Sequence, residues 1–201
     1  MNKPFSPSAD RNKAPILNVL RQELTSGQMV LEIGSGTGQH ACYFAAALST
    51  ITWQPTELEQ NIAGIRSWIS EKELSNILEP LVLDVDTQPW PVSTAQICFT
   101  CNTFHIVSMH SVQSIFAGSK TVLKQGGKLC VYGPFSIDGQ HTSAGNEQFD
   151  QQLRADDRAS GIRDLTRLDE LAQQNGYSAA RKIAMPANNF LVVWETAASQ
   201  R

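Results

Sequence analysis

Residues 29–38 read Met29-Val30-Leu31-Glu32-Ile33-Gly34-Ser35-Gly36-Thr37-Gly38. The first five residues form a short apolar run that ends directly in three alternating glycines. Further on, Ala41, Phe44, Ala45 and Leu48 recur at the i, i+3, i+4, i+7 spacing of a helix with one buried face. We therefore predict a strand, a glycine turn and a helix in this order, which is the first unit of an α/β fold.

The same alternation of apolar runs and helix-period segments continues along the chain. Further strands, with helices between them, are predicted at residues 51–56, 80–85, 95–101 and 128–132. Two last runs, at 177–184 and 190–195, flank the turn-forming residues 185–189 and predict an antiparallel hairpin. The pattern as a whole predicts one Rossmann-like α/β domain with a mostly parallel sheet and helices on both faces.

Some connections between these elements are also predicted. The pair Gly126-Gly127 is expected to stop the helix that follows the fourth strand, and the polar stretch Ser136–Asn146 is expected to form an inserted loop at one rim. Later, Thr166-x-x-Asp169 matches a capping box and predicts a helix that ends before Gly176.

Length, composition and charge narrow the class of protein. A chain of 201 residues with 41% hydrophobic residues fits one domain with a substantial core. The formal net charge is -3 and the basic residues are scattered, so nothing supports a nucleic-acid partner, although such a substrate stays open. No apolar segment has the length of a membrane span or the pattern of a signal peptide, so we expect a soluble cytoplasmic protein.

The cysteines and histidines do not predict a metal site. Cys98 and Cys101 form a C-x-x-C, but the strand period of two points their side chains to opposite faces. His40, His110 and His141 show no metal-ligand spacing with each other or with the cysteines. We therefore interpret the cysteines as small buried apolar residues.

The three glycines of the first turn predict a ligand site. Backbone approaches a ligand closely only where side chains are absent, and ligands of open parallel sheets bind at the carboxyl ends of the strands. A tight turn without a ligand is the alternative.

The residues around the glycines favour one cofactor. A dinucleotide motif, G-x-G-x-x-G/A, needs a third small residue where Gln39 stands in this chain. Glu32 precedes the glycines, and a carboxylate there repels a pyrophosphate but can hold an ammonium group. This combination favours S-adenosyl-L-methionine over NAD.

Two further acids end the next two predicted strands. Glu57 lies about twenty residues after the turn, where a carboxylate can accept hydrogen bonds from both ribose hydroxyls. Asp84 can accept a hydrogen bond from an adenine amino group. Each acid alone is better explained as a solvated strand end, but together with Glu32 they predict a nucleoside site.

Seven short motifs along the chain carry a family resemblance. They are Ala9-x-Arg11-Asn12-Lys13, Glu32-x-Gly34-x-Gly36-x-Gly38, Gln54-Pro55-Thr56-Glu57, Asn102-x-x-His105-Ile106, Tyr132-Gly133-Pro134-Phe135, Gly161-Ile162-Arg163-Asp164 and Met185-Pro186-Ala187-Asn188-Asn189. The second resembles motif I of the class I methyltransferases. The whole set resembles the methyltransferase-like protein 26 family, formerly called domain of unknown function 938.

This resemblance implies a seven-stranded sheet that ends in an antiparallel hairpin, with S-adenosyl-L-methionine as the cofactor, while the substrate of the family is unsettled. Glu57 stands where the family commonly has Asp, and Val107-Ser108-Met109 stands where a Ser-Pro-Trp run is frequent. The second departure affects the wall expected on the substrate side. The expected cofactor-binding residues are Glu32, Gly34, Ser35, Gly36, Thr37, Gly38, Glu57, Asp84 and Asn102.

Methyl transfer is an in-line displacement at an activated sulfonium carbon, so alignment and exclusion of water supply much of the rate. His105, just past the fourth strand, is the candidate general base, and a histidine that only hydrogen-bonds to backbone is the alternative. Arg163 can clamp a substrate carboxylate, or it forms a surface ion pair with Asp164. The candidate substrate-binding residues are Asn12, Tyr132, Arg163 and Asn188; for Asn188 a turn-forming role is the alternative, and for Asn12 a frayed terminus.

These observations predict one domain with three parts: an N-terminal segment and helix at 1–27, a cofactor-binding half at 28–133, and a substrate-side loop, helices and closing hairpin at 134–201. The predicted function is an S-adenosyl-L-methionine-dependent methyltransferase that acts on an unidentified small molecule. A catalytically silent module that binds this cofactor and an NAD-dependent oxidoreductase are the alternatives.

Overall fold

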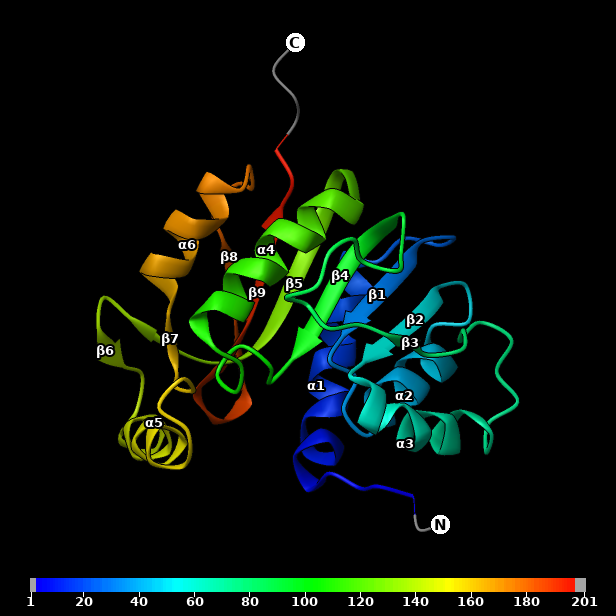
Figure 1. The fold of residues 1–201 in the computed structure, drawn as a ribbon, viewed down its shortest axis with the longest axis horizontal. Helices are drawn as coiled ribbons and strands as arrows, with labels where there is room; N and C mark the ends of the chain where they lie inside the picture. Colours follow the sequence, from blue (N-terminus) through cyan, green and yellow to red (C-terminus); the bar gives the residue numbers. More distant parts are fainter. Residues whose placement is uncertain (1–2, 198–201) are drawn as a thin grey trace.

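The computed structural model describes residues 3–197. Its main sheet has the strand order β3-β2-β1-β4-β5-β9-β8, which confirms the predicted seven-stranded sheet (Figure 1). Neighbouring strands from β3 to β5 are parallel, and β9 is antiparallel to both β5 and β8, so the predicted closing hairpin is also confirmed. The strands are β1 Met29–Ile33, β2 Thr52–Glu57, β3 Leu81–Val82, β4 Ala95–Cys101, β5 Leu123–Ile137, β8 Arg181–Met185 and β9 Asn189–Glu195.

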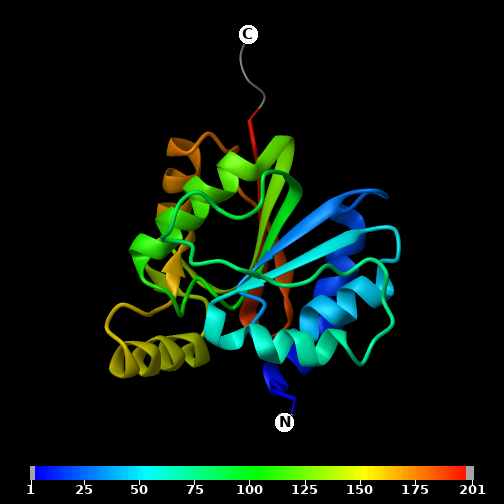
Figure 2. The same ribbon diagram turned by 45° about the vertical axis from the view of Figure 1, so that its right-hand side comes forward.

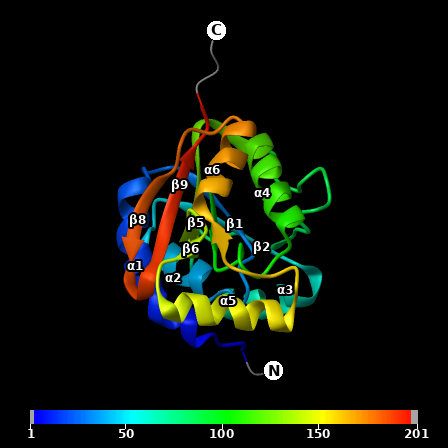
Figure 3. The same cartoon turned by 90° about the vertical axis from the view of Figure 1, so that its left-hand side faces the viewer.

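Helices cover both faces of the twisted sheet (Figure 2). One core cluster holds apolar residues of α1 and α2, and the other holds those of α4 and α6, so the two pairs lie on opposite faces. Figure 3 shows α5 crossing one end of the sheet. The helices are α1 Pro7–Glu23, α2 Gln39–Ala47, α3 Glu59–Ile69, α4 Met109–Val122, α5 Ala144–Asp156 and α6 Leu165–Gln174.

The connection around β5 differs from the prediction. Helix α4 ends at Val122 and β5 begins at the next residue, so Gly126-Gly127 lie within the extended segment and do not stop the helix. Strand β5 then continues to Ile137 and turns into a hairpin with β6, Gln140–His141. Short strand β7, Arg163–Asp164, pairs with β5 as well. The predicted loop at residues 136–146 is therefore wrong in part: residues 136–137 and 140–141 form a hairpin, and helix α5 begins at Ala144.

The predicted capping box at the start of α6 is also wrong. The helix begins at Leu165, and its N-cap is Asp164, whose Oδ1 accepts from the backbone N–H groups of Thr166 at 3.0 Å and Arg167 at 3.4 Å. A carboxylate satisfies two of the free N–H groups at a helix start and matches the helix dipole. Asp164 therefore starts the helix two residues earlier than the hydroxyl of Thr166 would.

The two cysteines of the C-x-x-C lie on opposite faces of β4, as predicted. Cys98 belongs to the core cluster beneath α4, and Cys101 packs against the core cluster beneath α1. Within residues 3–197, no three His, Cys, Asp or Glu side chains are placed to hold a metal ion. In the same part of the chain, every helix is too short or too polar to traverse a bilayer.

Candidate functional site

The glycine turn between β1 and α2 has left-handed backbone at all three glycines, with φ of 71° at Gly34, 55° at Gly36 and 88° at Gly38. A Cβ at Gly38 would lie 2.9 Å from the Cα of Ile65, so this glycine lets α2 pack closely on α3. A Cβ at Gly34 would lie 3.1 Å from Thr103 Oγ1. At Gly36 nothing lies within 4 Å, so its bare backbone faces open space.

Gly36 lines two hollows, one of about 670 Å³ beside α3 and one of about 460 Å³, which we call the turn cavity. The glycine turn meets the ends of β2 and β4 and the start of α1 there. Six of the predicted cofactor-binding residues line it, namely Gly34, Ser35, Gly36, Thr37, Glu57 and Asn102. The other three, Glu32, Gly38 and Asp84, do not belong to its lining.

Glu57 presents a carboxylate to the turn cavity. Its Oε2 accepts from the backbone N–H of Gly36 at 2.7 Å, and its Oε1 accepts from the N–H of Leu58 at 2.9 Å. Apolar side chains line the same cavity, with Leu58 39% exposed and Ile106 57% exposed. A carboxylate beside exposed apolar surface suits a nucleoside, because the diol of the ribose needs acceptors and the base needs an apolar face.

Glu32 lies beneath the glycine turn and is 1% exposed. Its Oε2 accepts from Trp53 Nε1 and from Ser35 Oγ, both at 2.9 Å. Burial raises the pKa of this carboxyl to about 7, against the opposing effect of these two hydrogen bonds. Ser35 Oγ also accepts from the N–H of Thr56 at 3.3 Å, so Glu32 orients the turn from below.

Asp84 is not brought to the site. Its side chain is exposed, and its Oδ1 accepts from the N–H of Asp86 at 3.0 Å, within its own loop. Strand β3 has only two residues, Leu81–Val82, so the loop begins before Asp84.

The start of α1 forms one wall of the turn cavity, with Ser6, Ser8 and Ala9. Gln39 fastens it: the backbone N–H of Ser6 donates to Gln39 Oε1, and Gln39 Nε2 donates to the carbonyl of Ser6 at 3.4 Å. Sequence reasoning placed Gln39 only as a departure from a dinucleotide motif. No local motif marks Ser6 or Ser8 as site residues, because they reach the site only through the docking of α1.

His40 also lines the turn cavity. It is 8% exposed, and burial lowers the pKa of its imidazole to about 4. Its ring stacks on Phe44 at 5.2 Å between centroids, so the imidazole is held as a neutral part of the wall.

Another cavity of about 300 Å³, which we call the side cavity, shares Ser8 and Asn102 with the turn cavity. Asn12 and Tyr132, two predicted substrate-binding residues, line it together. The tip of the closing hairpin contributes Pro186, Ala187 and Asn189. The predicted Asn188 is exposed and does not line it; its carbonyl instead accepts from Asn146 Nδ2 at 3.1 Å.

Arg163 lines neither of these cavities. Its Nε donates to the carbonyl of Phe104 at 2.9 Å, and its Nη2 donates to the carbonyls of Val107 and Ala159. The guanidinium therefore braces the segment between β4 and α4, and it forms no ion pair with Asp164 in the described part of the chain.

His105, the predicted base, is 5% exposed and also lines neither cavity. Its ring contacts Phe149 edge-on, with 5.4 Å between centroids. Burial and the nearby charge of Arg163 lower the pKa of the imidazole to about 4. This placement favours a packed structural side chain over the predicted base. The backbone hydrogen bond of the alternative is not among the contacts of the ring within residues 3–197.

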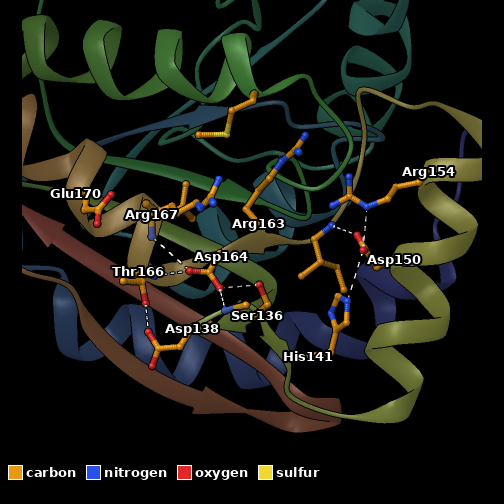
Figure 4. A pocket seen from close by; sticks show the side chains of 14 residues that line it. Ser136, Asp138, His141, Asp150, Arg154, Arg163, Asp164, Thr166, Arg167 and Glu170 are labelled. Carbon is orange, nitrogen blue, oxygen red and sulfur yellow. Dashed lines mark hydrogen bonds and ion pairs between the residues drawn. The ribbon is translucent and has the colours of Figure 1, made fainter.

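A larger hollow of about 1010 Å³ lies between β6, α5 and α6 (Figure 4). Two of its carboxylates, Asp150 and Asp164, are already in use. Asp150 accepts from Arg154 Nε at 2.9 Å and from the N–H of Ile162 at 2.6 Å. Asp164 accepts from Ser136 Oγ at 3.0 Å and caps α6. Since the glycine turn does not line this hollow, we assign its charges to the support of the β5 extension.

Solved structures with the same fold define the class of the sheet. The S-adenosylmethionine-dependent methyltransferase SibL aligns with a TM-score of 0.80 at 16% identity, over 95% of this chain and 56% of its own. An O-methyltransferase family protein from Burkholderia thailandensis gives 0.81 at 14% identity, over 96% and 58%. Human N-acetylserotonin methyltransferase in complex with SAM gives 0.79 at 12% identity, over 95% and 53%. At these identities the likeness shows the fold, that of the class I methyltransferases, and the chain spans rather more than half the length of each relative.

A family model narrows the assignment further. Residues 3–196 match the family described as Protein of unknown function (DUF938). The chain belongs to this family, as the seven motifs indicated.

Proposed function

We propose that the protein is an S-adenosyl-L-methionine-dependent methyltransferase that binds its cofactor in the turn cavity and a small methyl acceptor in the side cavity. The observation that carries the proposal is the bare backbone at Gly36, which faces a cavity that also holds the Glu57 carboxylate. The structural relatives support the same cofactor, because one of them is a complex with SAM and another, PigF, is a complex with SAH.

The residues of the turn cavity fit the parts of this cofactor. Glu57 would accept hydrogen bonds from the ribose hydroxyls, and Leu58 and Ile106 would contact the apolar faces of the base. Glu32 would act from beneath the turn, by fixing Ser35 and by adding negative potential near a cationic ligand. The cofactor supplies an activated methyl group, and the side chains align the acceptor with it and exclude water.

An NAD-dependent oxidoreductase fits this site less well. A third small residue of a dinucleotide motif would stand where Gln39 stands, and this side chain holds Ser6 instead. The helix-packing role of that third residue is taken by Gly38, against Ile65. The two acids near the turn, Glu32 and Glu57, also disfavour a pyrophosphate.

Calorimetry with S-adenosylhomocysteine and S-adenosylmethionine tests the cofactor. We expect both to bind, and Glu57→Gln to weaken binding about 10- to 100-fold, as expected for lost hydrogen bonds to a charged acceptor. The matched control is Glu59→Gln, an exposed acid two residues away that does not line the turn cavity. Failure of both ligands to bind at millimolar concentration would remove the proposal, as would fluorescence enhancement of NADH that S-adenosylhomocysteine cannot compete away.

Gly36→Ala is a second test that separates binding from folding. The new methyl group meets nothing within 4 Å in the protein, so the cost to folding is the strain of a left-handed alanine. Gly27 is the matched control, because its φ is 82° and the space around it is also open. We expect Gly36→Ala and Gly27→Ala to lose similar stability, but only the first to lose affinity for S-adenosylhomocysteine. Equal affinities in the two variants would place the ligand elsewhere. Turnover with a metabolite library then separates an enzyme from a silent binding module.

A further inference from the structure

The side cavity has a distinctive charge composition. Among the residues that line it, Arg11 is the one with a permanent charge, and no carboxylate is present. Arg11 is exposed, and within residues 3–197 no hydrogen bond or ion pair engages its guanidinium. Its neighbour on the helix, Lys13, is by contrast paired with Asp10. A free guanidinium fork is suited to bind a planar carboxylate through two parallel hydrogen bonds.

The rest of the polar lining is neutral. Three amides, Asn12, Asn102 and Asn189, and the hydroxyl of Ser8 surround the cavity. Asn189 Nδ2 already donates to the carbonyls of Pro186 and Ala187, and Asn12 Nδ2 donates to Cys101 Sγ. The remaining amide and hydroxyl donors can serve an anion, whereas no group of this lining compensates the charge of an ammonium group. The volume of about 300 Å³ lies at the lower end of ligand cavities, so the occupant is a small molecule.

No side chain of this lining can accept a proton at neutral pH. Burial raises the pKa of the Tyr132 hydroxyl to about 12, so it stays protonated. In the adjoining turn cavity, His40 has a pKa lowered to about 4, and its Nε2 is held by Asn12 at 2.7 Å. His105 lines neither cavity. The carboxylate of the turn cavity, Glu57, accepts from the N–H groups of Gly36 and Leu58 instead. This lining therefore favours an acceptor that has no proton to lose.

Acceptor groups differ sharply in this respect. A carboxyl group, with an ordinary pKa of about 4, is ionised at neutral pH, whereas a phenol at about 10 or an alkyl ammonium above 10 keeps its proton. Of these three groups, only the carboxylate needs no base from the protein.

We infer that the methyl acceptor is a small organic acid, bound by Arg11 in the side cavity and methylated on its own carboxylate oxygen. The inference rests on the proposed cofactor site. In the step, a lone pair of the carboxylate oxygen forms the bond to the methyl carbon while the carbon–sulfur bond breaks, and its electron pair stays on sulfur. The anion becomes a neutral ester and the sulfonium becomes a neutral thioether, so no proton is transferred and no other reactant is needed.

Alkali distinguishes this product from the others. The protein is incubated with S-adenosylmethionine that carries tritium in its methyl group and with the small-molecule fraction of a cell extract, and the products are treated with base. A methyl ester releases labelled methanol, whereas a methyl ether or a methylamine does not. We expect base-labile label.

Variants of two arginines on α1 connect this product to the side cavity. Arg11→Gln is expected to lower label transfer at least about tenfold, which is the loss of one charge-assisted contact, and Arg11→Lys to restore part of it. Arg21→Gln is the matched control, because Arg21 is exposed on the same helix and lies outside both cavities. It should transfer label like the wild type.

Calorimetry with S-adenosylhomocysteine on the same proteins keeps the two proposals apart. If the ligand binds but the label is base-stable, is absent, or is insensitive to Arg11→Gln, the organic-acid inference is overturned while cofactor binding stands. If the ligand fails to bind the wild type, the proposed function itself is lost.

Discussion

Asn12 on α1 and His40 on α2 share a hydrogen bond, with 2.7 Å between Asn12 Oδ1 and His40 Nε2. Both side chains are buried. The Nδ2 of the same Asn12 also donates to Cys101 Sγ on β4, at 3.7 Å. The amide of Asn12 therefore connects α1, α2 and β4 at the border between the turn cavity and the side cavity.

Asn12→Ala should loosen this connection. The change leaves a buried imidazole nitrogen without its partner, so we expect the free energy of unfolding in urea to fall by about 1–3 kcal/mol. Affinity for S-adenosylhomocysteine should fall as well, because α1 forms a wall of the turn cavity. Asn18→Ala, at an exposed position of the same helix, should change stability by less than about 0.5 kcal/mol. Equal stabilities of the two variants would show that the Asn12 contact does not fasten the helix.

Gly38→Ala should destabilise the protein more than Gly27→Ala. Both positions have left-handed backbone, with φ of 88° and 82°, so both pay a similar conformational strain. At Gly38 the new methyl group would also lie 2.9 Å from the backbone of Ile65, whereas at Gly27 it meets nothing within 4 Å. We expect the overlap to add about 1–3 kcal/mol to the loss, measured by urea unfolding. A difference near zero would mean that α3 moves freely away from α2.

The fold could be predicted from the sequence because periodic burial is a local signal. Strand β4 was predicted with its observed limits, Ala95–Cys101, from one apolar run. Strand β5 was predicted too short, because Gly133-Pro134 suggests a turn and the extension to Ile137 depends on pairing with β6 and β7 from later parts of the chain. The N-cap of α6 was also predicted at the wrong residue. Asp164 and Thr166 can both cap a helix, and only the backbone geometry of the folded chain selects Asp164.

The site was predictable where a motif is contiguous. The glycine turn and Glu57 lie next to each other in consecutive βα units, and they line one cavity as expected. Asp84 was predicted from its position after a strand, but β3 ends early and the side chain closes its own loop. Arg163 was predicted from its chemistry, and the carbonyls that engage its guanidinium lie up to 59 residues away in the chain. Such long-range partners leave no local trace in the sequence.

The acid stability of the protein should depend on its buried histidines. The pKa of His105 is lowered to about 4, below its value of about 6.5 in an unfolded chain, so the unfolded chain binds more protons between these two values. The stabilisation by the neutral ring is complete above about pH 6.5 and is lost as the pH falls toward 4. We expect His105→Gln to reduce the loss of unfolding free energy between pH 7 and pH 5 by on the order of 1–2 kcal/mol.

The same variant tests whether His105 acts as a base. Because the ring lines neither cavity, methyl transfer by His105→Gln should persist at a rate close to that of the wild type. A loss of about 100-fold or more, with intact binding of S-adenosylhomocysteine, would instead assign general-base catalysis to this side chain.

Glu32→Gln should have the opposite pH signature. Burial raises the pKa of Glu32 to about 7, above its ordinary value of 4.5, so the folded protein binds more protons between these values. The contribution of the neutral carboxyl to the free energy of unfolding is complete below pH 4.5 and is lost as the pH rises through about 7. Glutamine stays uncharged and keeps an acceptor for Trp53. Between pH 5 and 8 the wild type should therefore lose on the order of 3 kcal/mol of unfolding free energy that the variant keeps. Glu59→Gln should show the wild-type profile.

Cofactor affinity of Glu32→Gln then distinguishes support of the turn from direct contact. Glu32 lies below Ser35 and does not line the turn cavity, so its charge acts on a bound ammonium only across a distance. We expect the affinity for S-adenosylhomocysteine to fall less than tenfold at pH 8, and less than in Glu57→Gln. A larger loss than in Glu57→Gln, with the thermal stability of Glu32→Gln preserved, would show that the carboxylate reaches the ligand itself and that the turn rearranges when the cofactor binds.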